Sequence, residues 1–428
     1  MMELKRINKK ENYLVYLMPF YFLLSQYRFF SVQVSIILLL CIAGRLFLTK
    51  RINMRINCRF LCFLGYVAIH DFATALLGYS DSATSFHRLL EYGLNFVLIL
   101  LVYAQDIHEA KLFKVWKVAV CIYALGLIIH YVQIYVFHKP VQMIQILPGA
   151  GAINTNDPNR PRSLFQEPSY LAEAMLPFLF LSLKRRNFKW SVIASGIIFF
   201  STSVNGILLA TILWLMFFSQ FLTKLKRFCV KVMRYFYERR NDKIAITLWS
   251  FSAVVIIAVL FGGVQASVAR VFSVLNGGAS FSARITQGFE VVSKLNFLQL
   301  LFGTFYNQAI DFVRDNIWLF TNTSVGMYVD QGESFVFLNG FCSLLFRYGL
   351  VGMALFLYTF RGMLFDKAFK ARKYAYISLI ALFGNDSLLN APYFATTLLL
   401  LIYYYRKPSV KELNEKNGEI LVGWKLFR

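Results

Sequence analysis

Long apolar runs dominate the pattern of hydrophobic and polar positions along the chain. Runs of about 17–22 residues recur through most of the sequence, and polar residues gather in short clusters between them. A helix rises about 1.5 Å per residue, so a run of this length matches a hydrocarbon core roughly 30 Å thick. The pattern predicts an all-α integral membrane protein with about 12 transmembrane helices.

The predicted spans are residues 12–28, 31–48, 60–79, 87–105, 117–137, 170–183, 190–203, 206–222, 244–263, 349–365, 374–388 and 391–405. Segment 333–347 is apolar but too short to cross, and Tyr348-Gly349 breaks it. If that segment crossed, the basic run 367–373 would face outward, against the positive-inside rule. We therefore predict a partial or re-entrant helix at 333–347.

Basic clusters set the predicted orientation. Residues 50–59, 184–186, 223–243 and 367–373 are rich in Lys and Arg, and such clusters mark the cytoplasmic side of a membrane protein. Both termini are then cytoplasmic, and the two long polar loops face the other, non-cytoplasmic side, which is the periplasm if the resemblance described below holds. The predicted division is 1–137 (N-terminal spans), 138–169 (first large periplasmic loop), 170–263 (middle spans with a basic cytoplasmic loop), 264–348 (second large periplasmic loop with a partial helix), 349–405 (C-terminal spans) and 406–428 (cytoplasmic tail).

Composition agrees with this pattern. Of the 428 residues, 58% are hydrophobic and 16% charged, against about 25% charged in soluble domains, which excludes a soluble enzyme and a disordered tail protein. The net charge of +23 would suggest nucleic acid in a soluble protein. Here the basic residues lie between apolar runs, so we expect membrane lipids rather than nucleic acid as partners. The six Cys are scattered and form no metal-binding pattern.

The stretch Arg160–Ser169 (RPRSLFQEPS) leads directly into a predicted span. Pro168 suits the first turn of a helix, which places Glu167 at a helix N-terminus, where the dipole favours a carboxylate. Two Arg residues at the membrane edge suit a phosphate, because each guanidinium offers a planar fork of donors. The alternative interpretation is a salt-bridged loop end with a capping Glu.

Charges inside predicted spans need a reason, since they are costly in lipid. Asp71 must face protein or a cavity. Arg88 and Glu91 are three residues apart on a helix, and either pair with each other or line a groove for the lipid phosphate. Glu173, inside the span that follows Glu167, is either part of the site or part of the scaffold.

The pattern Arg-x-Arg-Ser-x-Phe-x-Glu-Pro-Ser before a span resembles the signature of the bacterial polysaccharide polymerase and O-antigen ligase superfamily. Three further places resemble the same family. Ser201–Gly206 (STSVNG) resembles its small polar turn between two spans, and Phe346–Gly352 (FRYGLVG) resembles its Tyr-Gly-x-x-Gly entry into a late span. Ser282-Ala-Arg284, followed by Leu301-Phe-Gly303, resembles its order of an Arg, an amphipathic helix and a Phe-Gly pair. The predicted topology resembles that of the family over nearly the whole chain.

The resemblance implies a GT-C-like membrane glycosyltransferase of the bacterial inner membrane that acts on undecaprenyl-pyrophosphate-linked sugars. It would polymerise oligosaccharide repeat units into O-antigen, capsule or exopolysaccharide on the periplasmic side. A chain-length regulator and a flippase are the expected protein partners. The residues that would hold the pyrophosphates are Arg160, Arg162 and Arg284, with Arg88 as a further contact. The catalytic residues would be Glu167 and Arg284. Glu167 would act as the general base or would orient an Arg side chain.

The sequence departs from the family in two respects: it has no His at the expected place, and both loops lack the fixed-spacing Arg-to-Gly repeat of some polymerases. The ligases carry a His in or just after the large loop, whereas the five His residues here are His70, His87, His108, His130 and His138. Glu333 and Asn339 stand in the corresponding place, and with Glu173 they are candidate acceptor or sugar contacts. This departure favours a polymerase over a ligase.

The chemistry needs no cofactor. A lipid-linked pyrophosphate is already an activated leaving group, and the chain has no phosphate-binding glycine motif of the nucleotide-binding type. Departing pyrophosphate gains charge that preorganised Arg can stabilise, and the acceptor hydroxyl needs at most one general base. We therefore expect metal-independent transfer. The alternatives are an O-antigen ligase and a lipid-linked oligosaccharide carrier, and a carrier would show pseudo-symmetric halves with broken helices near the midplane.

Overall fold

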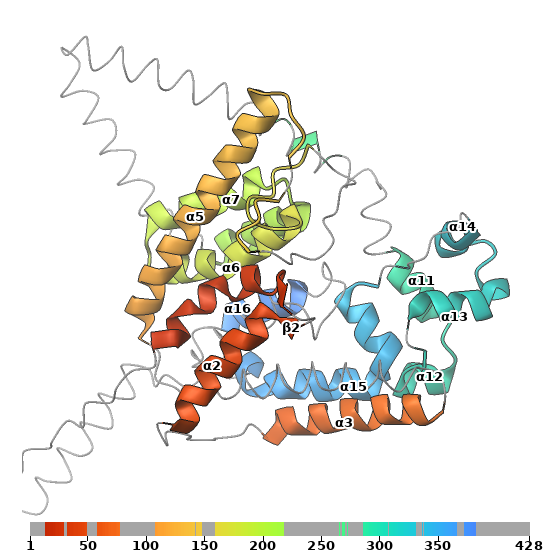
Figure 1. The fold of residues 1–428 in the computed structure, drawn as a ribbon. Coiled ribbons are helices and arrows are strands. Elements are labelled where there is room, and N and C mark those ends of the chain that lie inside the picture. The colour runs from red at the N-terminus through yellow and green to blue at the C-terminus, as the bar shows by residue number, and fades with distance from the viewer. Residues whose placement is uncertain are drawn as a thin grey trace, which may run out of the picture.

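The computed structural model describes residues 13–29, 32–48, 58–77, 108–147, 159–217, 286–330, 336–365 and 372–381, apart from positions 142, 307 and 337, with four isolated positions between 265 and 272. This part of the chain is mostly helical (Figure 1). Its β-structure is one antiparallel hairpin of two-residue strands, β1 (Arg28–Phe29) and β2 (Val32–Gln33).

The remaining elements, in chain order, are η1 (Tyr13–Phe20), α1 (Tyr21–Leu24), α2 (Val34–Leu48), α3 (Cys58–Leu76), α5 (Glu109–Tyr135), α6 (Pro168–Lys184), α7 (Phe188–Phe200), the helix Val204–Phe217, α11 (Gln287–Ser293), α12 (Phe297–Phe302), α13 (Ala309–Asp315), η3 (Ile317–Leu319), α14 (Ser324–Asp330), α15 (Gly340–Phe365) and α16 (Arg372–Ala381).

Two of these helices are long and apolar enough to cross a membrane: α5, and the part of α15 from Gly340 to Arg361. Five shorter apolar helices accompany them in the described residues: Tyr13–Leu24, Val34–Arg45, Leu61–Leu76, Phe188–Phe200 and Val204–Phe217. The predicted spans 87–105, 244–263 and 391–405 lie outside the described residues.

Several predicted boundaries match the structure. Helix α6 ends at the predicted basic cluster, where Arg186 takes a positive φ of 55°. A turn separates α7 from the next helix, as predicted, but it lies at 201–203, slightly before the predicted break between residues 203 and 206. Gly349 breaks α15 with φ 64° and ψ −169°, so the short apolar segment before it and the span after it meet at a kink.

The first predicted span differs from the expected continuous helix. Residues Tyr13–Phe20 form a 3₁₀ helix, and α1 adds only one α-helical turn before the chain enters the β-hairpin. Pro19 lies in this stretch, and proline lacks the N–H that an α-helix interior requires. By contrast, the helix of the predicted span 117–137 starts earlier than expected, because α5 begins at Glu109 and runs on without a break.

One large hydrophobic core joins elements from both ends of the chain. It includes buried residues of η1, α1, α2, α3, α5, α6, α7, α15 and α16. Helix α6 packs on α7 and α5, and α3 runs along α15 (Figure 1). Fourteen α6 residues are buried, so this helix lies at the centre of the packing.

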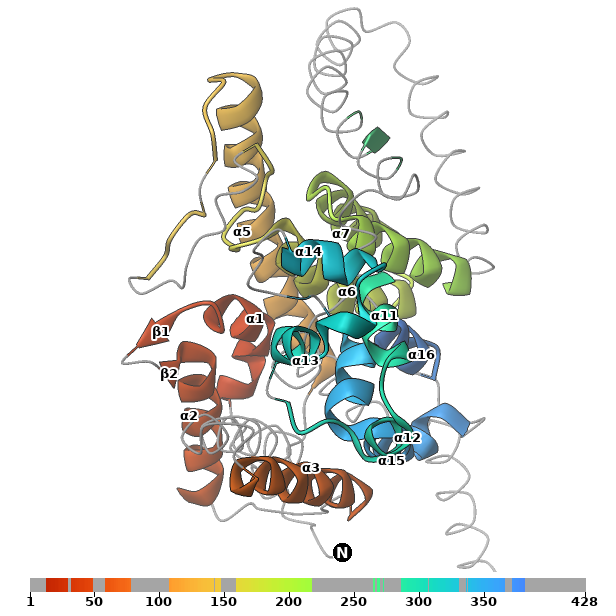
Figure 2. The ribbon, with the colours of Figure 1, turned by 90° about the vertical axis from the view of Figure 1, so that its right-hand side faces the viewer.

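The second predicted loop is more structured than the expected single partial helix. Residues 286–330 form four short α-helices and a 3₁₀ turn, and α11 and α12 pack beside α15 (Figures 1 and 2). These helices have a core of their own around Phe312, Phe320 and Phe346. Asn296 and Gln299 form a reciprocal capping box at the start of α12, with N–H···O distances of 2.8 and 3.0 Å.

Candidate functional site

The candidate site is the arginine loop, residues 159–167, which lies between α5 and α6. His130 of α5 is fully buried, and its Nδ1 accepts the backbone N–H groups of Arg162 (3.1 Å) and Ser163 (3.0 Å). An imidazole nitrogen that accepts hydrogen bonds carries no proton, so the neutral ring holds its proton on Nε2. His130 therefore fixes the backbone at the second Arg of the motif.

One face of α5 is shaped to receive this loop. Tyr123, Gly126 and His130 follow the spacing that puts residues on one side of a helix. The Ser163 hydroxyl donates to the Tyr123 carbonyl at 2.8 Å. A Cβ on Gly126 would collide with the Ser163 side chain, so the loop approaches α5 only because a glycine is present there.

Arg162 lies inside the protein. Its side chain is 2% exposed, and its Nη1 donates to the Gln166 carbonyl at 3.2 Å. The Gln166 N–H in turn donates to Gln26 Oε1 at 2.6 Å, which ties the loop to the end of α1. Phe165 is fully buried with its ring 5.0 Å from that of Tyr123. The structure thus places Arg162 where it orders the loop.

Arg160 lies nearer the surface and joins two segments that resemble the same family. It is half-buried, and its Nε donates to Thr202 Oγ1 at 3.4 Å. Thr202 lies in the turn at 201–203 with a φ of 58°. A Cβ on Gly206, in the first turn of the next helix, would collide with Ala172, so this region also packs tightly on α6. Two of the predicted motifs, forty residues apart, therefore meet in space.

Two carboxylates belong to the helix that follows the loop. Glu167 is the N-cap residue of α6, as predicted, with extended backbone angles and Pro168 after it. Its side chain makes no capping bond but accepts the Ser169 hydroxyl at 3.0 Å through Oε2. Glu173 is 5% exposed and lies within the main core beside the buried residues of α6. A carboxylate buried this deeply is stable only with polar or charged company.

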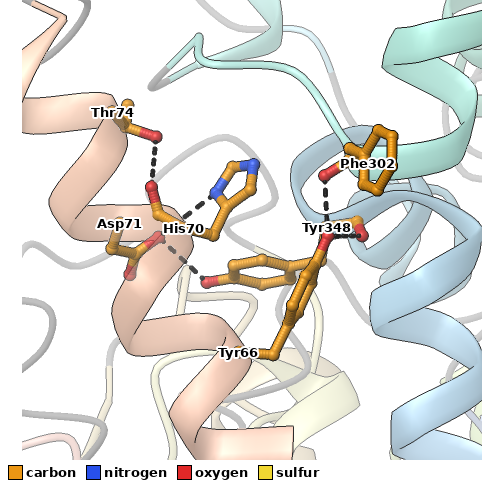
Figure 3. Close-up of polar contacts among 6 residues, drawn as sticks. All are labelled: Tyr66, His70, Asp71, Thr74, Phe302 and Tyr348. Carbon is orange, nitrogen blue, oxygen red and sulfur yellow. Dashed lines mark hydrogen bonds and ion pairs between the residues drawn. The ribbon is translucent and has the colours of Figure 1, made fainter.

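A second polar cluster links α3 to α15 (Figure 3). The Tyr66 hydroxyl donates to the carbonyls of Phe302 (2.9 Å) and Tyr348 (3.0 Å). The Tyr348 hydroxyl donates to Asp71 Oδ1 at 3.4 Å, and His70 Nδ1 lies 3.9 Å from the same oxygen. Asp71 therefore faces protein, as expected because an ionisable side chain is energetically costly in lipid.

The described parts of the other two segments that resemble the family, Leu301–Gly303 and Phe346–Gly352, dock at this cluster. Gly303, with φ 94°, follows α12, and Gly349 forms the kink in α15. A Cβ on Gly349 would lie 2.5 Å from the backbone nitrogen of Gly303. The Thr304 N–H donates to the Phe346 carbonyl at 2.7 Å, which fixes the pair.

Asn339 lies in a different place from the arginine loop. It is fully buried and caps α15, because its Oδ1 accepts the Cys342 N–H at 2.9 Å. Glu290, an acidic residue of the second loop, has a similar capping role: its Oε2 accepts the Ser324 hydroxyl (2.9 Å) and the Val325 N–H (3.0 Å) at the start of α14.

Three predicted site residues, Arg88, Arg284 and Glu333, lie outside the described residues. Of the others, the structure brings Arg160, Arg162 and Glu167 together in one loop, and it places Asn339 beside α11. His130 was missed as a site residue, although a histidine inside an apolar run is itself a signal of function. Among the described residues, no group of three or more His, Cys, Asp or Glu side chains is placed to hold a metal ion.

Comparison with family models, curated proteins and solved structures gives no match for this chain.

Proposed function

We propose that this chain is a multi-pass inner-membrane glycosyltransferase that polymerises undecaprenyl-pyrophosphate-linked oligosaccharide repeat units on the periplasmic side. The observation that carries the proposal is the hydrogen bond from Arg160 to Thr202. It joins the Arg-x-Arg loop to the small polar turn, two of the segments whose sequences resemble the polymerase and ligase superfamily. The proposal includes about 12 spans, a GT-C-like arrangement and two large periplasmic loops.

The exposed surface of α5 supports a lipid environment. Large apolar side chains including Val118, Leu125 and Ile128 are more than half exposed and follow a helical stripe opposite the buried face. In water, each square ångström of apolar surface left exposed costs about 25 cal/mol, whereas lipid tails cover it without that penalty.

Contacts between helix ends support the proposed orientation. Glu109 at the start of α5 contacts Lys184 and Arg185 at the end of α6, each at 3.4 Å, and both ends are assigned to the cytoplasm. Arg160 contacts Thr202 at the opposite ends, and both of these are assigned to the periplasm. Each contact therefore pairs segments that the positive-inside rule places on the same side.

The proposed chemistry is transfer of a growing glycan. An acceptor hydroxyl on a fresh lipid-linked repeat unit attacks the anomeric carbon of the chain. The bond from that carbon to the pyrophosphate oxygen breaks, the lipid pyrophosphate leaves, and a base takes the hydroxyl proton. Arg160 contacts the pyrophosphate, and Glu167 takes the proton or orients the guanidinium.

The burial of Arg162 assigns it a supporting role in this scheme. Its backbone and side chain hold the loop in shape, so that Arg160 lies beside the turn at 201–203, where its Nε contacts Thr202. Arg284, from the second loop, is proposed as the second phosphate ligand. Such preorganised donors stabilise charge that develops on the leaving group.

The test uses purified protein in liposomes with lipid-linked repeat units. Products carrying two or more repeat units on one lipid support the polymerase. Transfer of one glycan to a different lipid acceptor identifies a ligase instead. Movement of the lipid-linked substrate across the bilayer without any new glycosidic bond identifies a carrier.

A further inference from the structure

Basic side chains gather where the start of α5 meets the end of α6 and the start of α7. Residues 109–117 and 184–190 together contain one acidic residue, Glu109, and seven basic ones: Lys111, Lys114, Lys117, Lys184, Arg185, Arg186 and Lys189. The three helices pack on one another (Figure 1), and contacts from α5 to Arg185 and to Trp190 join their ends here. These basic residues form what we call the basic patch.

Aromatic rings hold two cations of the basic patch in position. The guanidinium carbon of Arg185 lies 4.8 Å from the centre of the Phe113 ring, and the Lys117 ammonium lies 5.8 Å from the centre of the same ring. The Lys117 ammonium is also 5.7 Å from the ring centre of Trp190 in α7. Each cation–π contact is attractive, whereas two like charges beside one ring repel each other. An anion close to both cations would lower that repulsion.

The protein neutralises part of this charge and leaves the rest. Glu109 contacts Lys184 and Arg185, each at 3.4 Å. Among the described residues, Lys114 and Lys117 form no ion pair; Lys114 is exposed and Lys117 is half-buried. The two lysines are three residues apart on α5 and so lie on neighbouring turns of one face. Two positive charges are therefore left for a partner outside the chain.

The surface beside the lysines indicates the class of partner. Lys114 lies at the lower end of the exposed apolar stripe of α5. The stripe continues with spacings of three and four residues through Val118, Ile122, Leu125, Ile129 and Val132. At 1.5 Å per residue it extends for about 21 Å, more than the roughly 15 Å of hydrocarbon in one leaflet. A phospholipid presents the same order, an anionic phosphate followed by apolar chains. A soluble anion or an acidic peptide matches the lysines but leaves the stripe uncovered.

We propose that Lys114, Lys117 and Arg185 bind the phosphate of an anionic phospholipid whose acyl chains lie along the apolar stripe of α5. Basic pockets between membrane helices are suited to such headgroups. The lipid belongs to the leaflet at the basic end of α5, which the proposed orientation assigns to the cytoplasm. The site lies at the opposite ends of α5 and α6 from the arginine loop, and it does not depend on glycan transfer.

Native mass spectrometry of the purified full chain in a neutral detergent tests the site. The probes are phosphatidylglycerol, which is anionic, and phosphatidylcholine, which has no net charge. We expect one phosphatidylglycerol to remain bound per chain at concentrations at which phosphatidylcholine does not. A neutral detergent removes the general attraction of an anionic bilayer, so selective retention requires a site on the protein.

Substitutions of equal charge locate the site. Lys114→Gln and Lys117→Gln should each weaken phosphatidylglycerol binding about fivefold, since a basic residue near an anionic lipid contributes about that factor. Lys294→Gln is the matched control, because it removes one exposed charge at the end of α11 and should leave binding unchanged. Equal binding by all variants, or equal weakening by the control, overturns the site and leaves the basic residues the role of orienting the chain.

Lysine acetylation separates a lipid from a free phosphate. In the same detergent, phosphatidylglycerol should slow acetylation of Lys114 and Lys117 severalfold, measured by mass spectrometry, with Lys294 as the internal control. Glycerol phosphate, which has the headgroup phosphate without acyl chains, should give no protection at the same concentration. Equal protection by glycerol phosphate identifies a soluble anion and overturns the lipid site. None of these measurements uses elongation, so failure of the lipid site leaves the proposed function untouched, and the reverse also holds.

Discussion

Gly303 and Gly349 bring their backbones together at the junction of α12 and α15. Both have a positive φ, 94° and 64°, and a Cβ on either one would collide with backbone atoms of the other segment. The second loop therefore docks on the kink of α15 through a close backbone contact that only glycine permits at these two positions. Tyr66 of α3 reinforces the contact by donating to carbonyls on both segments.

Alanine at either glycine should weaken this docking. Gly349→Ala combines an unfavourable φ with a backbone collision, a cost of about 1–3 kcal/mol, and should lower the melting temperature of the detergent-purified protein. Gly196→Ala in α7 is the control, because nothing lies within 4 Å of its added methyl group. A fall in melting temperature for Gly196→Ala equal to that for Gly349→Ala contradicts the docking.

Removing the His130 side chain should release the arginine loop. His130→Ala leaves the N–H groups of Arg162 and Ser163 without their acceptor, and each buried unpaired group costs roughly 1–3 kcal/mol. We expect faster proteolysis between Arg160 and Glu167 and a lower kcat for elongation. His138→Ala, at an exposed histidine after α5, should leave both measurements unchanged.

The second phosphate ligand can be tested through its geometry. Arg284→Lys keeps the charge but replaces a planar fork with a point donor, so most elongation activity should be lost at normal expression. Arg314→Lys and Arg270→Lys should be tolerated far better, and Arg314 is exposed on α13. The measurement is the glycan length distribution of the three variants at matched protein levels. Near-normal chain lengths from Arg284→Lys would show that Arg284 is not part of the site.

Elongation in vitro should survive EDTA. The predicted mechanism stabilises the leaving pyrophosphate with Arg donors, and the sequence of the two loops contains no clustered Asp, His or Cys set. The measurement compares glycan length with and without the chelator. Activity that disappears and returns with added magnesium contradicts this mechanism.

Helix boundaries and breaks could be predicted where one residue type controls the backbone. Pro168 opens α6, the basic cluster closes it, and Gly349 interrupts α15, each as the sequence indicated. The length of the apolar run wrongly predicted a continuous α-helix at Tyr13–Phe20. The run is as apolar as a transmembrane span, but it contains Pro19, which lacks the N–H that an α-helix interior requires, and the residues form a 3₁₀ helix.

Contacts between distant segments could not be predicted. His130 and Arg162 are 32 residues apart, and the pattern of either segment alone contains no sign of the other. The resemblance implied a helix between Arg284 and Leu301, where α11 lies, but the hydrophobic pattern did not predict the short helices of the second loop, since six- and seven-residue helices lack enough turns for a clear hydrophobic period. The sequence Asn296-Phe-Leu-Gln299 did carry a capping-box signal that marks the start of α12.

The most direct test of the central claim compares wild-type protein with Arg160→Lys in liposomes supplied with lipid-linked repeat units. Lys reaches the same region but cannot both bond Thr202 and present a fork to the pyrophosphate. The account predicts a ladder of long glycans from the wild type and from the exposed-site control Arg361→Lys, and almost none from Arg160→Lys. A wild-type protein that never joins two repeat units, or an Arg160→Lys ladder equal to the wild type, contradicts it.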